Sequence, residues 1–362
     1  MPLKTTRGDA GGPTKGRGAP SNLEGRYESW AREAVDDGWQ REEEESGRLE
    51  TVVTRETAKS IIARNDSPDI GFDQSINPYR GCEVGCAYCF ARPSHAFLGL
   101  SPGLDFETRI FAKVNAAVLL REELAAPRYR CSPIAIGANT DAYQPVEREL
   151  RITRSVIEVL TECEHPFTLV TKSALIERDI DLLAPAAAKR LTRAAVSVTN
   201  LDPVLARKLE PRAAAPYRRL KTVRRLAAAG IPVTVMVAPV IPFITDRHIE
   251  GILERAREAG ATGAWYVLLR LPHEVAPLFK DWLATHYPLK AAHVMSLVRQ
   301  MRGGKDYDST FGLRQRGTGT FADLIEKRFE IACERLGLNG EREPLDTTRF
   351  RPPRTAPQLN LF

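Results

Sequence analysis

Short apolar, β-branched runs alternate with amphipathic stretches through the middle of the chain, from about residue 72 to residue 270. This alternation predicts parallel βαβ units, and about six of them favour a barrel or a doubly wound sheet. The expected strands are Phe72–Asn77, Pro133–Ala138, Phe167–Thr171, Ala194–Thr199, Pro232–Ala238 and Ala264–Leu269. The expected helices are Glu107–Glu123, Ile152–Cys163, Glu177–Ala188, Pro216–Ala229 and Asp246–Ala259. In either fold the functional groups should lie in loops at the carboxyl ends of the strands.

The composition changes on both sides of this alternating region. Residues 1–25 are rich in Gly, Pro, Lys and Arg with few large apolar side chains, so we expect them to be disordered. We expect the remaining 337 residues of the 362 to form an N-terminal extension (26–70), a core (71–272), a helical C-terminal region (273–340) and a polar tail (341–362).

Several protein classes are excluded by what the sequence lacks. No stretch approaches about 18 consecutive apolar residues, so a transmembrane helix is not expected. The first residues lack the apolar segment of a secretory signal. Six cysteines in 362 residues are too sparse for a disulfide scaffold. We therefore expect a cytoplasmic protein that makes no membrane contact.

Three of the six cysteines lie within eight residues, directly after the first expected strand. They are Cys82, Cys86 and Cys89, and two nearby glycines let the backbone loop round a common centre. Three sulfur ligands suit a structural zinc ion, which would need a fourth ligand such as His95. They equally suit a [4Fe–4S] cluster in which one iron stays open. The residues alone leave both metal centres open.

The C-x3-C-x2-C spacing, with the aromatic Tyr88 before the third cysteine, resembles the signature of the radical SAM superfamily. The wider stretch 75–113, with segments 138–147, 171–173 and 208–220, is similar to a bacterial subgroup related to spore photoproduct lyase and described as DNA-repair-photolyase-like. The resemblance implies an α/β fold, a partial (β/α)6 TIM-type barrel with a helical C-terminal extension. It also implies an enzyme whose [4Fe–4S] cluster, held by the three cysteines, cleaves S-adenosylmethionine to a 5′-deoxyadenosyl radical.

The same resemblance implies residues that contact S-adenosylmethionine. The Tyr88 backbone would lie near the adenine, and Lys172, at the end of the third strand, would contact the methionine end. Ser197 and Thr199 are candidates for the ribose, and Asn139 follows the second strand in a turn that could approach the cluster or the cofactor. The alternative for Lys172 is an ordinary ion pair at the mouth of the barrel. For the other side chains it is capping of turns and helices.

Two further segments carry family features. Residues 239–242 (PVIP) resemble the superfamily's adenine-contacting segment, which acts largely through its backbone, so no side-chain role is assigned. Prolines at strand ends are also common as simple punctuation. Glu210 and Arg212 lie in an EPR sequence that looks like a recurring element, and we expect them to pair with each other near the cofactor.

The cysteine that donates a hydrogen atom in the lyase family has no counterpart on the corresponding loop of this sequence. That family uses a cysteine on the loop after the second strand, whereas the loop here reads GANTDAYQ. Cys131 precedes the strand, and Cys163 and Cys333 lie in helical segments where we expect small buried side chains. Tyr143 could relay a radical, or it could simply pack. The departure argues against thymine-dimer reversal, and the catalytic residues remain unknown.

A strongly basic segment suggests contact with nucleic acid. Residues 203–225 contain eight Lys and Arg against the single acid Glu210. Arg218, Lys221 and Arg225 fall on one face of the expected helix and could neutralise phosphates, with binding that weakens as salt rises. The alternative is a solvated basic helix on the outside of the barrel.

The last five residues, QLNLF, follow a Pro-containing segment at the end of the polar tail. An extended tail that presents Gln358, Leu359, Leu361 and Phe362 can dock in an apolar groove. It resembles the pentapeptide by which bacterial repair proteins bind the replication sliding clamp. The alternative is a tail that packs back on its own domain.

Together these features predict a radical SAM enzyme that acts on a lesion or modification in DNA or RNA. Such an enzyme needs an electron donor such as flavodoxin or ferredoxin. One alternative keeps the radical chemistry with a protein or small-molecule substrate. Another is a non-catalytic module that binds zinc or a cluster and associates with DNA.

Overall fold

The computed structural model describes residues 16–27, 49–341 and 343–353. These residues include a seven-stranded sheet in the order β10-β9-β8-β7-β6-β3-β2. Its strands are β2 (Ile62–Arg64), β3 (Gln74–Ile76), β6 (Ile134–Ile136), β7 (Phe167–Thr171), β8 (Thr192–Ser197), β9 (Val233–Val240) and β10 (Gly263–Leu268). Six strands run parallel, and β2 pairs antiparallel with β3. All six predicted strands are confirmed, in the sequential order of a partial barrel.

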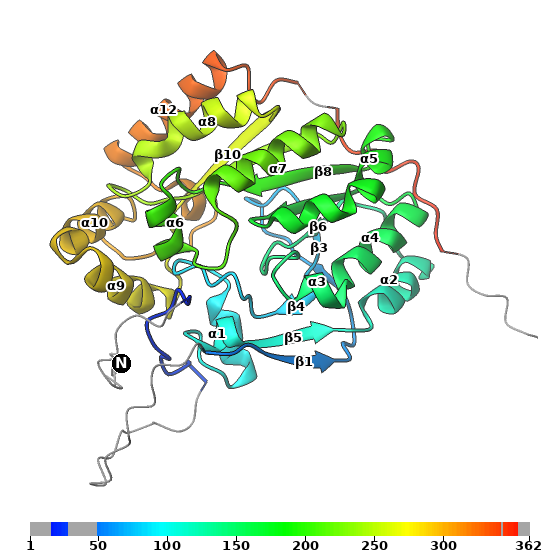
Figure 1. Cartoon of the computed structure of the whole chain (residues 1–362), viewed down its shortest axis with the longest axis horizontal. Coiled ribbons are helices and arrows are strands. Elements are labelled where there is room, and N and C mark those ends of the chain that lie inside the picture. Colours follow the sequence, from blue (N-terminus) through cyan, green and yellow to red (C-terminus); the bar gives the residue numbers. More distant parts are fainter. Residues whose placement is uncertain (1–15, 28–48, 342, 354–362) are drawn as a thin grey trace, which may run out of the picture.

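Helices follow the parallel strands and pack on the sheet (Figure 1). The helices up to β10 are η1 (Arg92–Leu98), α1 (Asp105–Thr108), α2 (Ala116–Ala125), α3 (Glu147–Leu150), α4 (Ile152–Glu162), η2 (Ala174–Asp179), α5 (Ile180–Ala188), α6 (Pro203–Leu209), α7 (Pro216–Ala228), η3 (Asp246–His248) and α8 (Ile249–Glu258). In α4, Val156, Ile157 and Leu160 share one face and are fully buried. Their spacing explains why this segment forms a helix on the core.

A second, three-stranded sheet corrects one predicted helix. It contains β1 (Val52–Glu56), β4 (Tyr79–Arg80) and β5 (Arg109–Lys113) in the order β1-β5-β4. We expected a continuous helix over 107–123, but β5 occupies its first third. Ile110 and Ala112 are fully buried while their neighbours are more exposed, which is the period of a strand. Pairing with β1 and β4 stabilises that alternative.

The C-terminal region is helical, as expected, and two of its helices cover the cysteine loop. Its helices are α9 (Val275–His286), α10 (Pro288–Gln300), α11 (Leu313–Arg316) and α12 (Thr320–Arg335). Phe279 and Trp282 of α9 belong to the same apolar cluster as Cys82 and Cys86. The Trp282 indole N–H donates to the Lys208 carbonyl at 2.9 Å. This cluster separates the cysteine loop from solvent on one side.

The N-terminal segment 16–27 packs against the body, so the disorder expected for residues 1–25 does not hold for residues 16–25. The backbone N–H groups of Gly18 and Ala19 donate to the Glu107 carboxylate at 2.9 and 2.8 Å. The side chain of Arg26 pairs with Glu274 at 2.7 Å. Composition could not show that this segment is ordered, because the carboxylates of Glu107 and Glu274 that bind it lie far along the chain.

The described part of the C-terminal tail runs back along the outer layer of helices. Phe350 packs against the rings of Tyr129 and His165, and the Arg351 N–H donates to the Cys163 carbonyl at 2.9 Å. The residues proposed to bind a sliding clamp, 358–362, lie outside the described residues. In the described ranges, no helix has both the length and the apolarity needed to cross a bilayer.

Candidate active site

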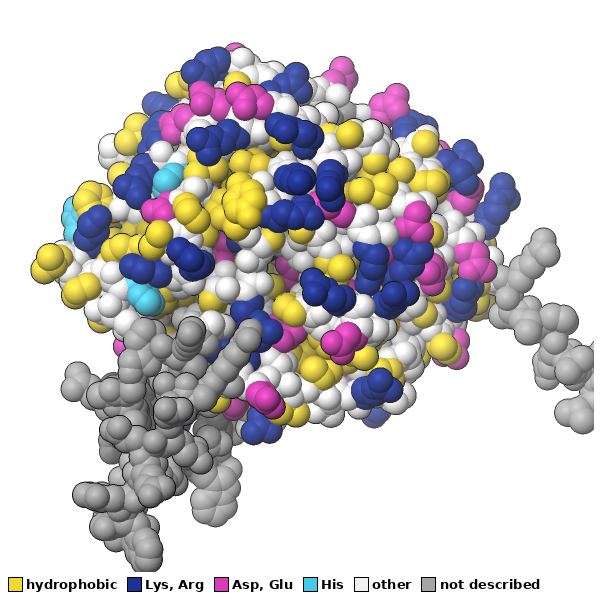
Figure 2. Space-filling model, in the orientation of Figure 1, with side chains coloured by type: hydrophobic (Ala, Val, Ile, Leu, Met, Phe, Trp, Pro, Cys, Tyr) yellow, Lys and Arg dark blue, Asp and Glu magenta, His cyan; other side chains and the backbone are white. Residues whose placement is uncertain are grey.

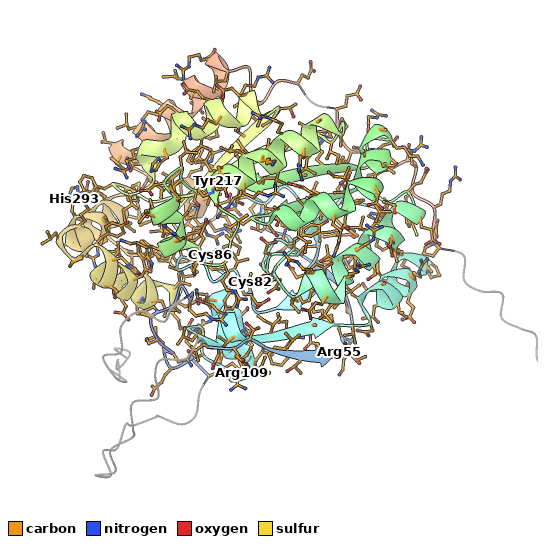
Figure 3. The ribbon with its side chains drawn as sticks, viewed as in Figure 1. Arg55, Cys82, Cys86, Arg109, Tyr217 and His293 are labelled. Atoms are coloured by element: carbon orange, nitrogen blue, oxygen red, sulfur yellow. The ribbon has the colours of Figure 1, made fainter. Side chains whose placement is uncertain are left out.

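The cysteine loop follows β3 and β4 and lies near the middle of the molecule (Figure 3). Gly85, on this loop, has a φ of +66°, and a Cβ there would lie 2.6 Å from the Glu107 carboxylate. Glycine is therefore required for the backbone to turn so close to that side chain. Cys82 and Cys86 are buried, whereas Cys89 is partly exposed.

The three thiols lie close enough to influence one another's charge. Burial raises the pKa of Cys82 well above its usual value, and the charges of Asp141, Cys86 and Cys89 raise it further. Burial also raises the pKa of Cys86 to about 12, although the positive charge of Lys172 opposes this increase. Only thiolates bind metal, so a cationic centre has to supply the compensating charge.

The donor set suits a cluster better than a single zinc ion. In the parts of the chain that the structure describes, no group of three or more His, Cys, Asp or Glu side chains converges to hold one metal ion. Zinc requires such convergence, whereas each cysteine of a [4Fe–4S] cluster binds a different iron. His95 joins no such group among the described residues. Its Nε2 donates to the Arg109 carbonyl at 3.0 Å, and its buried Nδ1 has no partner there.

A buried ion pair contacts and supports the cysteine loop. Arg92 and Glu107 are both fully buried and form an ion pair. Arg92 also donates to the Cys86 carbonyl at 2.8 and 2.9 Å. Because two charges removed from water need full pairing, these contacts fix the backbone at Cys86. Nothing in the sequence pattern indicates that Arg92 and Glu107 pair.

A second buried network holds the aromatic residue of the motif. The Tyr88 hydroxyl donates to Glu210, which also accepts a hydrogen bond from Arg219 at 2.5 Å. Arg219 donates further to the Ser197 carbonyl at 3.1 Å. The expected pair between Glu210 and Arg212 is therefore wrong. Arg212 pairs instead with Glu83 at 3.3 Å, because the turn before α7 directs it toward the loop.

Lys172 lies where the sequence predicted, at the end of β7 and beside the motif. Its ammonium is 5.9 Å from the centre of the Tyr88 ring. Asp141 positions it by accepting hydrogen bonds from the Lys172 N–H at 2.8 Å and the Thr171 hydroxyl at 2.6 Å. Asp141 thereby joins the loops after β6 and β7. From the sequence, Asp141 was expected, with Asn139 and Thr140, in a turn that could approach the cluster or the cofactor, and its bond to Lys172 was not foreseen.

Unsatisfied polar atoms gather after β8. The Thr199 hydroxyl and both amide atoms of Asn200 are buried, with no hydrogen-bond partner among the described residues. Ser197 is also buried, whereas Asn139 is exposed at the end of β6. Buried polar groups normally have partners, so these atoms are suited to a ligand with hydroxyl or amine groups. Asn200 was missed because strand-end asparagines usually cap turns.

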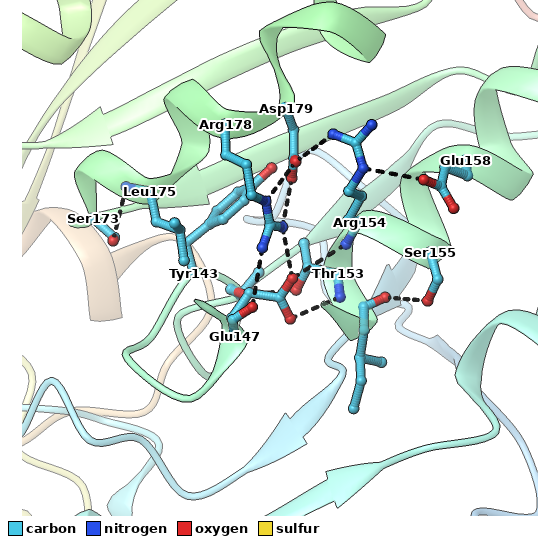
Figure 4. Close-up of polar contacts among 12 residues, drawn as sticks. Tyr143, Glu147, Thr153, Arg154, Ser155, Glu158, Ser173, Leu175, Arg178 and Asp179 are labelled. Atoms are coloured by element: carbon cyan, nitrogen blue, oxygen red, sulfur yellow. Dashed lines mark hydrogen bonds and ion pairs between the residues drawn. The ribbon is translucent and has the colours of Figure 1, made fainter. Parts of the chain in front are cut away.

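An ionic network anchors the loop after β6 (Figure 4). Arg178 pairs with the buried carboxylates of Glu147 and Asp179, both at 2.8 Å, and Arg154 pairs with Asp179 at 2.9 Å. The Tyr79 hydroxyl, from β4, donates to Glu147. This network links the small sheet to α3, α4 and η2 and so holds the loop that carries Asp141.

A cavity of about 580 Å³ opens beside the cysteine loop. Its wall includes Val84, which lies between Cys82 and Cys86, and Lys172. The other residues that line it are Tyr143, Pro145, Arg148, Glu149, Ser173, Ala174, Leu175, Arg212, Ala213, Ala214 and Arg218. A smaller cavity of about 380 Å³ lies at the amino ends of β3 and β6, away from the cysteines.

The predicted basic face on α7 is partly neutralised. Arg218 donates to both carboxylate oxygens of Glu177, and Arg225 pairs with the same group at 2.5 Å. Burial opposes ionisation of Glu177, but the hydrogen bonds from these arginines and from Thr222 lower its pKa to about 2. Lys221 forms no ion pair with a described residue. Arg218 and Arg225 thus share a face toward Glu177, and their pairing with it leaves a smaller net charge there than the sequence suggested.

The other three cysteines lie in the positions expected from the sequence. Cys163 and Cys333 are buried in the main core. Cys131 is half-buried at the amino end of β6, far along the strand from the cysteine loop.

Tyr143 is buried and lines the cavity. Ile241, in the PVIP segment, is fully buried, and its N–H donates to the Thr245 hydroxyl at 2.7 Å.

Comparisons with known proteins agree with this site. Residues 76–256 match the radical SAM superfamily. An uncharacterized protein of Mycobacterium tuberculosis is 38% identical over 63% of this chain and 68% of its own length. An uncharacterized protein of Methanocaldococcus jannaschii is 25% identical over 59% of this chain and 76% of its own. The family match covers the cysteine loop and strands β6 to β9.

Solved structures show the same fold at low sequence identity. Spore photoproduct lyase complexed with dinucleoside spore photoproduct superposes with a TM-score of 0.56 and 16% identity, over 79% of this chain and 80% of the lyase. Another structure of that lyase contains bound AdoMet together with the dinucleoside. With the family match over 76–256, these findings show that the chain belongs to the radical SAM superfamily, whose enzymes use a [4Fe–4S] cluster and S-adenosylmethionine.

Proposed function

We propose that this enzyme holds its [4Fe–4S] cluster through Cys82, Cys86 and Cys89 and uses it to act on a lesion or modification in a nucleic acid. The observation that carries the proposal is the grouping of three mutually interacting thiols with Lys172 at the carboxyl ends of the parallel strands. Parallel α/β folds place their active sites at this end. The thiols are suited to hold the cluster, and the cation is suited to bind the carboxylate of S-adenosylmethionine.

Lys172 is the residue we assign to the carboxylate of S-adenosylmethionine. Burial alone would lower its pKa, but the neighbouring charges of Cys86 and Glu210 raise it above its usual value, so the ammonium stays charged. When bound, the cluster and S-adenosylmethionine supply one-electron cleavage of a sulfonium bond and abstraction of a hydrogen atom from the substrate. The role of Lys172 is to bind and orient an anionic group beside the cysteine loop.

Polar groups after β8 are assigned to the ribose and its surroundings. Each buried group without a partner costs about 1–3 kcal/mol, so Thr199 and Asn200 gain free energy when a ligand supplies partners. Ser197 contributes the carbonyl that holds Arg219 and thereby the Glu210 and Tyr88 network. We assign Tyr88 to the adenine through its backbone, as the motif suggests. The exposed Asn139 remains a candidate for contact with the cofactor.

The nucleic-acid substrate is supported by the likeness of the fold to spore photoproduct lyase, which has been solved with a dinucleoside lesion. The loop after β6, on which the lyase family carries its hydrogen-donating cysteine, contains no cysteine, and Cys131 lies at the other end of the strand. A thiol cannot return hydrogen from this loop. We therefore propose a lesion or modification whose chemistry needs no such thiol.

The substrate is tested by product analysis under anaerobic conditions. The reconstituted enzyme is incubated with S-adenosylmethionine, a reductant and either irradiated duplex DNA, untreated duplex DNA or RNA, and nucleosides are then measured by mass spectrometry. We expect one nucleic acid to raise 5′-deoxyadenosine formation and to yield a nucleoside of changed mass, while Cys86→Ala yields neither. A peptide or small molecule that stimulates the reaction while all nucleic acids leave it unchanged would contradict the proposal.

A further inference from the structure

We propose that Arg270 and Arg302, near the carboxyl end of β10, form a site for one phosphodiester group of a nucleic-acid strand, with the exposed ring of Phe90 beside it. This inference rests on the proposed function, because it names the part of a nucleic acid that the enzyme holds. None of these three residues lines the 580 Å³ cavity beside Lys172, so the site is separate from that cavity.

A fully buried arginine without an acidic partner marks this site. The side chains of Arg92, Arg219 and Arg302 are almost completely removed from water. Arg92 pairs with Glu107 and Arg219 pairs with Glu210, whereas Arg302 forms no ion pair with any described residue. Arginine is almost never fully buried unless it is paired. The missing partner of Arg302 therefore points to an anion that comes from outside the chain.

The contacts of Arg302 leave part of its charge without a counterpart. Its two terminal nitrogens donate to the carbonyls of Leu313 and Leu269 at 2.8 and 2.9 Å. Its Nε is buried and has no hydrogen-bond partner among the described residues. Burial and the charge of Arg270 lower the pKa of Arg302 to about 10, so the group stays charged at neutral pH. An anion bound next to both cations would offset their mutual repulsion.

Arg270 is the more accessible member of the pair. It follows β10 by two residues and is half-buried. One of its terminal nitrogens donates to the Tyr307 hydroxyl at 3.4 Å, while its Nε is buried without a partner among the described residues. The charge of Asp308 reaches Arg302, but this carboxylate accepts a hydrogen bond from the Thr310 N–H at 2.8 Å and pairs with neither arginine. Arg270 is thus free to bind an anion.

The site lies beside the cysteine loop. Phe90 follows Cys89 directly, and its side chain is 41% exposed. The guanidinium carbon of Arg270 is 4.9 Å from the centre of the Phe90 ring. Figure 2 shows Lys and Arg side chains over most of one face of the molecule, so exposed charge alone does not mark a binding site. An unmatched cation next to an exposed ring is more specific, because nucleic-acid strands are held by phosphate contacts to arginine and by bases that stack on aromatic rings.

The position of the site favours the substrate over the cofactor. Lys172, which we assign to the carboxylate of S-adenosylmethionine, follows β7, and strands β8 and β9 lie between β7 and β10 in the sheet. The anion at Arg270 is therefore a second anion. A planar guanidinium can donate two parallel hydrogen bonds to one phosphate group. A strand held there by its backbone would place a neighbouring base next to Phe90 and the cysteine loop.

The test compares a charged strand with an uncharged one. Fluorescence anisotropy measures how the reconstituted enzyme binds a short labelled DNA strand and the same strand with neutral methylphosphonate linkages. The variants are Arg270→Gln and Arg270→Lys. Arg316→Gln is the matched control, because Arg316 also stacks on an aromatic ring, that of Trp265 at 4.5 Å, but pairs with Glu326. Iron content and circular dichroism verify that every variant is folded and loaded.

The wild type should bind the charged strand more tightly than the neutral strand. We expect Arg270→Gln to lower this preference at least about fivefold and to reduce the slope of log affinity against log salt by about one. Arg270→Lys should retain part of the preference, because its positive charge remains, and Arg316→Gln should retain all of it.

An unchanged preference in Arg270→Gln would overturn this inference alone, because binding of the strand would persist. Weaker binding of S-adenosylmethionine with unchanged strand binding would overturn it and assign the arginines to the cofactor. Stronger competition by an oligoglutamate peptide than by unlabelled strand would overturn it and indicate an acidic protein partner. A wild type that binds neither strand would contradict the proposed function together with this inference.

Discussion

At the scale of single residues, the six cysteines divide by their surroundings. Cys82 and Cys86 lie beside Lys172 and Asp141, where charge is available to bind and orient ligands. Cys163 and Cys333 lie among apolar side chains of the main core. A sulfur removed from the first group should therefore affect metal content, whereas a sulfur removed from the second should affect packing alone.

We predict that Cys86→Ala loses the cluster and keeps the fold. Iron should fall from about four atoms per chain to less than one, because two cysteines hold a cluster poorly, while the far-ultraviolet circular dichroism stays the same. The matched control is Cys163→Ala, which should keep its iron and lose only about 1 kcal/mol of unfolding free energy. Full iron content in Cys86→Ala would refute the ligand assignment.

Glu177 gives a pH prediction for stability. Its pKa is lowered to about 2 in the folded protein, against 4.5 for the free group, because hydrogen bonds from Arg218, Thr222 and Arg225 outweigh burial. Its stabilisation is therefore present above about pH 4.5 and is lost as the pH falls toward 2. Because solvent screens the half-exposed Arg225, we expect the charged Glu177 to contribute about 1–2 kcal/mol to the free energy of unfolding.

The measurement compares unfolding free energies of the wild type and Glu177→Gln across pH. The difference between them should be largest near pH 6–7 and should shrink steadily below pH 4.5. A difference that is constant from pH 7 to pH 3 would show that the carboxylate's charge contributes nothing.

Site residues could be predicted from the sequence where the motif itself holds them together. Cys82, Cys86 and Cys89 share one loop, and Lys172 is marked by its place at a strand end. The supporting pairs could not be predicted. Glu107 meets Arg92 across 15 positions, and Asp141 meets Lys172 across 31, so only the packing of loops brings them together. The expected partner of Glu210 was wrong for the same reason.

At the scale of elements, the six parallel strands could be predicted because nearly all of their residues are buried or half-buried, which favours short runs rich in apolar and β-branched side chains. Strands β1, β2 and β5 could not be predicted from the sequence. Their outer residues are exposed, and β5 lies between two short helices, so it resembles part of a longer helix until its partner strands are known. Segment 16–27 has no periodic pattern at all. Its order depends on acceptors in α1 and directly before α9.

We predict that segment 16–19 protects the cluster loop. A Cβ at Gly18 would lie 1.8 Å from the Gly85 carbonyl oxygen, so Gly18→Val should detach the segment and the hydrogen bonds to Glu107. Cluster loss in air or with a chelator, followed by visible absorbance, should then be several-fold faster. Gly71→Val, at a position with open space around it, is the control and should match the wild type. An unchanged rate in Gly18→Val would refute this protective role.

At the scale of the whole molecule, the barrel, the C-terminal helices and the N-terminal segment meet around one loop. α9 and α10 cover it from one side and residues 16–19 contact it from another, while the cavity leaves a third side open. The molecule therefore controls access to its cysteines through parts that are distant in sequence.

The tail prediction concerns partners rather than catalysis. Deletion of residues 358–362 should abolish binding to a bacterial sliding clamp, because Gln358, Leu359, Leu361 and Phe362 carry the proposed peptide. Cleavage of S-adenosylmethionine should stay at the wild-type rate. The check is a pull-down with purified clamp. Equal capture of the full chain and the truncated chain would exclude the peptide as the binding element.

The central claim is that Cys82, Cys86 and Cys89 hold a [4Fe–4S] cluster that cleaves S-adenosylmethionine. The most direct measurement is anaerobic reconstitution followed by reduction with S-adenosylmethionine present. The account predicts a brown protein with about four iron and four sulfide per chain that forms 5′-deoxyadenosine and methionine. A colourless protein that retains one zinc ion and forms no 5′-deoxyadenosine would contradict it.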